Sequence, residues 1–267
     1  AEACKILTDK LADGGEGTLE VLTEATGGRL ESIRVHDPLM RPVTAQLGIS
    51  GDGSTAFIEM ARASGLALLT PEERNPLHAS TFGTGELIRH ALDLGCTEIV
   101  IGIGGSATVD GGVGMARALG MSFTDDTGWE LPPGGGSLGS LFRIDTVNRD
   151  PRIATCRIFV ACDVQNPLTG PFGAAHVFGP QKGASPEMAL LLDANLKHLA
   201  RIIREQLHND VEQVPGGGAA GGLGAGLAAF LGAEMKPGFE VMALATRLEE
   251  HIRWADMVIT GEGKLDA

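Results

Sequence analysis

The stretch that decides the fold is Ile101-Gly102-Ile103-Gly104-Gly105-Ser106-Ala107-Thr108-Val109-Asp110-Gly111-Gly112-Val113-Gly114, which joins an apolar segment to a helical one. Six of the thirteen residues from Gly102 onward are glycine. Glycines let backbone N–H groups point into one concavity, hydroxyl groups add donors, and the helix start adds the positive end of its dipole. A tight turn with left-handed residues would explain only one or two of these glycines. The stretch therefore predicts an anion site.

Strands and helices alternate on both sides of this loop, which indicates an α/β protein with a mixed sheet, divided into two lobes. The predicted strands are residues 30–35, 43–49, 56–60, 97–103, 157–162 and 256–260. The predicted helices are residues 2–11, 18–26, 84–94, 115–119, 186–208, 219–231 and 241–254. The first three strands form a meander with turns at Asp37-Pro38 and Gly51-Asp52-Gly53. Ligands bind where strand carboxyl ends meet helix starts, so we expect the site near Gly104 and Gly261.

Composition excludes several classes of protein. The 267 residues carry a net charge of −13, which disfavours nucleic acids and anionic membranes as partners. No apolar run approaches the ~20 residues needed to span a bilayer, and the first residues lack signal-peptide features, so we expect a cytoplasmic protein. The four cysteines lack metal or disulfide spacing and are predicted to be buried thiols. The chain has 39 glycines and only 11 aromatic residues (9 Phe, 2 Trp, no Tyr), so we expect backbone groups, rather than aromatic side chains, to bind the ligand.

Carboxylates stand beside glycine loops at three places. Asp13-Gly14-Gly15-x-Gly17 and Asp110-Gly111-Gly112-x-Gly114 repeat one pattern, and residues 260–266 form a third acidic loop. Each Asp is either an N-cap, worth about 0.5–2 kcal/mol, or a group for magnesium, phosphate or proton transfer. Asp163, which follows a predicted strand, is likewise either a turn cap or a site carboxylate.

Two lysines also lie in glycine loops, Lys182 within Gly179-Pro180-Gln181-Lys182-Gly183 and Lys264 within the acidic loop. Each is either a point charge for phosphate or a solvated loop lysine. The phosphate-loop motif G-x-x-x-x-G-K-[ST] and the nucleophile motif G-x-S-x-G are absent. Gly216-x-Gly218-x-x-Gly221 matches a dinucleotide pattern, but residues 211–215 are a poor strand to precede it, so only the following helix start is kept as a phosphate neighbour.

Several motifs together resemble bacterial glycerate kinases of the first class. They are residues 12–18 (ADGGEGT), 102–112 (GIGGSATVDGG), 161–164 (ACDV), 178–183 (FGPQKG), 219–222 (AAGG) and 259–266 (ITGEGKLD). They follow the family's order across nearly the whole chain.

The resemblance implies magnesium-dependent transfer of phosphate from ATP to D-glycerate, giving 2-phosphoglycerate. It also implies a flavodoxin-like α/β domain made of residues 1–30 with 238–267, and a larger inserted α/β domain, residues 31–237, resembling the restriction-endonuclease-like fold.

The resemblance also implies roles for individual residues. Catalytic roles fall to Asp13, Asp110, Lys182 and Asp266. Nucleotide binding falls to Gly104, Gly105, Ser106, Gly111, Gly112 and Lys264. Substrate binding falls to Gly14, Gly15, Glu16, Arg62 and Gly221. Magnesium binding falls to Asp13, Glu16, Asp163 and Glu262.

Some questions stay open at this point. Which carboxylate is the general base is left open, as is the oligomeric state. Family members begin with a strand that precedes Ala1 and continue beyond Asp266, so we expect this sequence to cover part of a longer protein with an incomplete flavodoxin-like domain. The alternative function is a non-catalytic nucleotide or organic-acid sensor built on the same loops.

Overall fold

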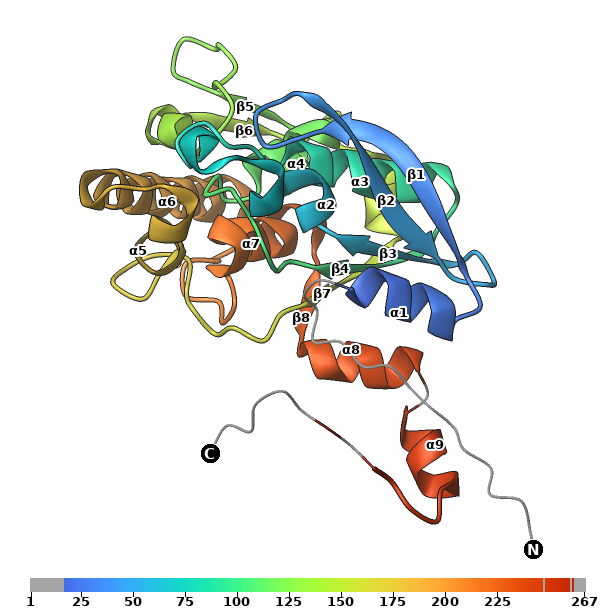
Figure 1. The fold of residues 1–267 in the computed structure, drawn as a ribbon. Coiled ribbons are helices and arrows are strands. Elements are labelled where there is room, and N and C mark those ends of the chain that lie inside the picture. The colour runs from blue at the N-terminus through green and yellow to red at the C-terminus, as the bar shows by residue number, and fades with distance from the viewer. Residues whose placement is uncertain (1–16, 247, 260, 262–267) are drawn as a thin grey trace, which may run out of the picture.

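A six-stranded mixed sheet forms the centre of the protein (Figure 1). The computed structural model describes residues 17–246, 248–259 and 261. The strands, in sheet order, are β1 Arg29–His36, β2 Pro42–Ile49, β3 Thr55–Glu59, β4 Glu98–Gly102, β7 Arg157–Ala161 and β8 Glu234–Lys236. β1, β2 and β3 are antiparallel, whereas β3, β4, β7 and β8 run parallel. The predicted meander and the mixed α/β class are therefore confirmed.

Helices cover both faces of this sheet. They are α1 Thr18–Ala25, α2 Ala61–Ser64, α3 Phe82–Asp93, α4 Val113–Ala118, α5 Ala174–Phe178, α6 Pro186–Leu207, α7 Ala219–Leu231, α8 Gly238–Ala245 and α9 Leu248–Trp254. A separate hairpin pairs β5 Ser122–Thr124 with β6 Arg143–Asp145. The longest helix, α6, begins where Ser185 accepts a hydrogen bond from the Met188 N–H and Pro186 occupies the first helical position.

Strand β4 is buried on both faces, as its apolar sequence predicts. Ile99 and Ile101 point into the larger core, which α3, α4, α6 and α7 also line. Val100 points to the opposite face and packs in a smaller core with Leu22 of α1 and Met242 of α8. Figure 1 shows α1 and α8 together on this side of the sheet. The division into domains 1–30 with 238–267 and 31–237 stays a prediction.

Two predicted elements near residue 250 are wrong. The single helix expected over 241–254 is two helices, α8 and α9, and Thr246, which directly follows α8, donates its hydroxyl to the Met242 carbonyl. Residues 256–259 form no strand, and Met257 and Ile259 are 78% and 88% exposed. A strand needs a neighbour for its backbone groups, and none of the described strands pairs with this segment. The helix expected at 2–11 lies outside the described residues.

The cysteines are only partly as predicted. Cys96 is buried, whereas Cys156 and Cys162 are partly exposed, and all three are free thiols. Cys156 directly precedes β7 and Cys162 directly follows it, so both lie at the ends of the strand. Cys4 lies outside the described residues. Within the described part of the chain, the search for a helix long and apolar enough to cross a membrane finds none.

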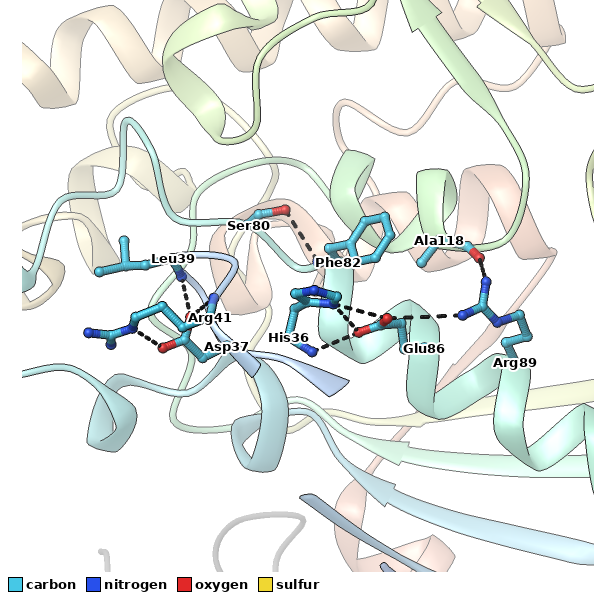
Figure 2. A network of polar contacts seen from close by, with 9 residues as sticks. All are labelled: His36, Asp37, Leu39, Arg41, Ser80, Phe82, Glu86, Arg89 and Ala118. Carbon is cyan, nitrogen blue, oxygen red and sulfur yellow. Dashed lines mark hydrogen bonds and ion pairs between the residues drawn. The ribbon is translucent and has the colours of Figure 1, made fainter. Parts of the chain in front are cut away.

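A polar network fixes the meander against the start of α3 (Figure 2). The Glu86 carboxylate accepts a hydrogen bond from the His36 N–H at 2.7 Å. The buried Asp37 carboxylate accepts from the Arg41 N–H and from Arg41 Nε at 2.9 and 2.6 Å. At the start of α3, the Phe82 N–H donates to Ser80 Oγ. The Glu86 contact therefore ties the end of β1 to α3, and Thr81, which directly precedes α3, contacts Asp110 of the glycine loop.

Candidate active site at the carboxyl edge of the sheet

A cavity of about 270 Å³ opens at the carboxyl ends of β4 and β7. Its walls are Ile103, Gly104, Gly105, Ser106, Ala161, Cys162, Asp163, Val164, Phe178, Gln181, Ala219 and Ala220. Three segments singled out in the sequence meet there: the glycine loop after β4, Asp163 after β7, and the start of α7. This is the edge at which open α/β sheets bind ligands.

A larger cavity of about 750 Å³ lies elsewhere. It lies on the sheet face lined by Phe57, Val100 and Phe159 and extends to Thr55 and Glu98 at the amino ends of β3 and β4. None of the glycine-loop residues lines it. We therefore place the candidate site in the smaller cavity.

The first half of the glycine loop is held against α2. The Gly105 carbonyl accepts from the Leu66 N–H at 2.8 Å, and the Ala107 N–H donates to the Ser64 carbonyl at 2.9 Å. Gly105 has a φ of +71°, which favours glycine. Gly104 and Gly105 are exposed at the cavity, so the structure places these nucleotide-binding candidates where a ligand can approach their backbone.

The second half of the loop is buried and does not reach the cavity. Asp110 is 1% exposed, and its carboxylate accepts from Thr81 N and Oγ1, Gly112 N and Gly114 N at 2.8–3.2 Å. Burial raises the pKa of the Asp110 carboxyl, and these hydrogen bonds act in the opposite direction. A Cβ on Gly111 would lie 2.3 Å from Leu199 Cδ2. This geometry favours the capping alternative for Asp110, and its catalytic role stays a prediction.

Lys182 is buried, which excludes the solvated-lysine alternative. Its side chain is 1% exposed, and Nζ donates to Ser106 Oγ and to the Thr108 carbonyl, both at 2.7 Å. Burial lowers the pKa of Lys182 to about 7, while the charge of Asp110 acts in the opposite direction. Its neighbour Gln181 lines the cavity instead. The predicted contact of Lys182 with a phosphoryl group stays untested.

Asp163 lines the cavity and is exposed. Its Oδ1 accepts from the Gly238 N–H at 2.9 Å, at the start of α8. This carboxylate therefore combines the two alternatives left open by the sequence, because it caps a helix and also faces the cavity. It is the one charged side chain among the described residues of the cavity wall.

Arg62 and Gly221, both predicted to bind substrate, do not line the cavity. Arg62 Nε pairs with Glu59 at 2.8 Å and Nη2 with Glu20 at 2.5 Å, which ties α1 to the end of β3. Glu59 also accepts from the Leu19 N–H, so the start of α1 lies at the same sheet edge as the glycine loop. A Cβ on Gly221 would lie 1.8 Å from the Thr108 carbonyl oxygen, so Gly221 serves close backbone packing.

Ala219 and Ala220 also line the cavity, and the sequence pointed to them only as part of the motif 219–222 and the start of its helix. Ala220, Gly221 and Gly222 have φ angles of 53°, 69° and 89°, which distort the first turn of α7. Of the described non-glycine residues with positive φ, only Ala220 lines the cavity. Left-handed backbone at an alanine costs about 1–2 kcal/mol, and such strain is often retained at functional sites. The signal in the sequence was the dense run of glycine and alanine.

The remaining predicted site residues lie outside the described residues: Asp13, Gly14, Gly15, Glu16, Glu262, Lys264 and Asp266. Their roles stay predictions. So does the expectation that Asp13 and Asp110 face one cleft.

Comparisons with known proteins bear on the fold and the family. The model of the glycerate kinase family matches residues 1–267. The chain is 56% identical to glycerate 2-kinase of Escherichia coli K12 and 52% identical to glycerate kinase of Halalkalibacterium halodurans. These matches cover 96% of this chain and 68% and 67% of the relatives. A crystal structure of a candidate glycerate kinase 2 from Salmonella typhimurium LT2 superposes with a TM-score of 0.93 at 54% identity, covering 96% of this chain and 68% of that one.

The chain thus spans about two thirds of the length of these relatives. Three findings agree: identity above 50% over nearly the whole chain, a family match over all its residues, and a superposable fold. The chain belongs to the glycerate kinase family.

Proposed function

We propose that this protein transfers the terminal phosphoryl group of ATP to D-glycerate and gives 2-phosphoglycerate. The observation that carries the proposal is the cavity in which Gly104–Ser106 and Asp163 line one space at the carboxyl edge of the sheet. The family membership and the names of the relatives support the substrate class.

The glycine loop would bind the nucleotide phosphates through its backbone. Phosphoryl transfer requires positioning and charge stabilisation more than covalent chemistry. Gly104 and Gly105 carry no side chains to block approach, and the hydrogen bonds to Ser64 and Leu66 hold the loop in one conformation. The loop is therefore preorganised for phosphate.

The cavity fits a magnesium ion that is held largely by phosphate oxygens. Within residues 17–246, 248–259 and 261, no group of three metal-ligating side chains occurs. Magnesium usually binds proteins through one or two carboxylates and takes its other ligands from phosphates and water. Asp163 supplies one such carboxylate at the cavity wall. When bound there, the ion would neutralise charge on the phosphates.

The acceptor of the hydroxyl proton is not Asp110 in this proposal, because that carboxylate is buried and bonded to four donor groups. Asp13 and Asp266 remain the proposed candidates, on the strength of their motifs. Lys264 is the proposed cation at the transferred group, since the described wall of the cavity holds no lysine or arginine.

Turnover tests the proposal directly. The intact protein is incubated with ATP, Mg²⁺ and D-glycerate, ADP is measured, and phosphorus NMR locates the phosphate on the product. L-glycerate and the omission of glycerate serve as controls. We expect ADP release that depends on D-glycerate and a phosphate on the C2 oxygen. ATP binding without glycerate-dependent ADP release would instead support the sensor alternative.

A further inference from the structure

We propose that Lys182 is a positioning residue that holds the glycine loop in its phosphate-binding conformation and does not contact the transferred phosphoryl group. The inference rests on the proposed function for the identity of the ligand. The position of Lys182 is independent of that function.

The first observation is where the lysine nitrogen lies. Nζ donates to the side chain of Ser106 and to the backbone carbonyl of Thr108, and both bonds measure 2.7 Å. Ser106 lines the cavity, whereas Lys182 does not. The nitrogen thus contacts the loop from inside the protein, and Ser106 lies at the cavity wall.

The second observation is how the chain delivers the lysine to this place. Lys182 ends a 3-10 turn, Pro180–Lys182, and Gly183 then reverses the backbone with a φ of +91°. A Cβ on Gly183 would lie 2.4 Å from the Arg74 carbonyl oxygen, so the turn is packed tightly against residue 74. The fixed turn therefore directs the lysine stem to the loop, where Nζ contacts Ser106 and Thr108, and Lys182 itself does not line the cavity.

The third observation is the stiffness of the loop itself. The loop has backbone bonds at Ala107 and Gly111, the latter from its N–H to the Gly221 carbonyl at 3.1 Å. Between these two points, Lys182 fixes the Thr108 carbonyl. Removing the lysine would leave a buried carbonyl and a buried hydroxyl without this donor, so the middle of the loop would open more often.

Lys182→Met tests the inference, because it keeps an unbranched stem and removes the donor. Hydrogen exchange is measured without nucleotide at the Ala107 and Gly111 amides. We expect exchange about tenfold faster there, equivalent to ~1.4 kcal/mol of local opening, with unchanged exchange in the centre of α6. ATP affinity by calorimetry should fall about tenfold, and KM for ATP should rise together with a lower kcat.

Lys197→Met is the matched control, since Lys197 is half-exposed and pairs with Asp193 away from the cavity. It should leave exchange, affinity and turnover unchanged. Ser106→Ala is the milder second variant and removes only one of the two acceptors. It should speed exchange at Ala107 less than Lys182→Met does, and the double variant should match Lys182→Met alone. If Lys182→Met fails to fold, the exchange rate at the Ala107 amide in Ser106→Ala tests the inference instead.

The opposite result is equally clear. The inference would be overturned if hydrogen exchange and ATP affinity were unchanged in the variants while Lys182→Met lost most of its kcat. The lysine would then be a direct phosphoryl contact. Because the exchange experiment contains no substrate, absence of turnover in the parent protein would contradict the proposed function without affecting this test.

Discussion

Replacing Asp110 with asparagine should destabilise the protein, because this carboxylate organises the starts of two helices. Oδ2 accepts from the Thr81 N–H and the Gly114 N–H, at the starts of α3 and α4. Oδ1 accepts from the Gly112 N–H. The Thr81 hydroxyl lies within hydrogen-bond distance of both oxygens. An asparagine retains one acceptor oxygen and turns the other into a donor.

The magnitude follows from which donors lose their partner. With the amide nitrogen at the Oδ1 position, one backbone N–H is left unpaired, and with the nitrogen at the Oδ2 position two are left. Each buried unpaired donor costs about 1–3 kcal/mol. The better orientation therefore predicts a loss of about 1–3 kcal/mol for Asp110→Asn, and Asp110→Ala should lose about 3 kcal/mol or more because all three N–H donors lose their acceptor.

Urea unfolding at pH 7 measures this loss as a shift of the midpoint at constant slope. Asp125→Asn is the matched control, because the partly exposed Asp125 makes similar bonds to Thr127 N and Oγ1 and to Trp129 N. Water replaces lost partners there, so that variant should stay within about 0.5 kcal/mol of the parent. If Asp110→Asn is as stable as the control yet loses turnover, the carboxylate acts in the chemistry and our reasoning is refuted.

Three further outcomes are expected. Gly105→Ala and the control Gly95→Ala, with φ of +71° and +87°, should each lose about 1–2 kcal/mol of stability, but only Gly105→Ala should weaken ATP binding in calorimetry. Asp163→Asn should leave the melting temperature nearly unchanged, because its amide oxygen still accepts from the Gly238 N–H. It should raise the Mg²⁺ concentration needed for half-maximal turnover about tenfold, which corresponds to ~1.4 kcal/mol. Between pH 7 and 10 the unfolded chain binds up to one more proton at Lys182 than the folded protein. The parent should therefore gain stability over Lys182→Met by at most ~1.4 kcal/mol per pH unit in urea unfolding, and a constant difference would contradict the lowered pKa.

Local patterns predicted most of the elements around the site. The apolar run before Gly104 became β4, and the stripe of residues 186–208 became α6, because each pattern reflects burial within a single element. The failures near residue 250 have a different cause. A strand depends on a neighbour that may lie far away in the chain, so apolar sequence alone did not make residues 256–259 a strand.

The candidate site divides in the same way. Gly104, Gly105 and Asp163 come shortly after the ends of β4 and β7, and because parallel strands end at one edge, sequence order was enough to bring them together. The sequence left two alternatives open for Asp110 and for Lys182, and it could not decide between them because Thr81 and Ser106 are partners from distant segments. Nothing near Lys182 in the chain indicated that its nitrogen would meet Ser106, 76 residues earlier.

The sequence by itself therefore determined a strand, a glycine loop and a helix in succession, since these features depend on neighbouring residues and their conformational freedom. Only the tertiary structure decided which charged groups reach the cavity. Burial is a property of the packed chain. It left the Asp163 carboxylate at the cavity wall, and it enclosed the Lys182 amine and the Asp110 carboxylate within hydrogen bonds to the loop and the helix starts.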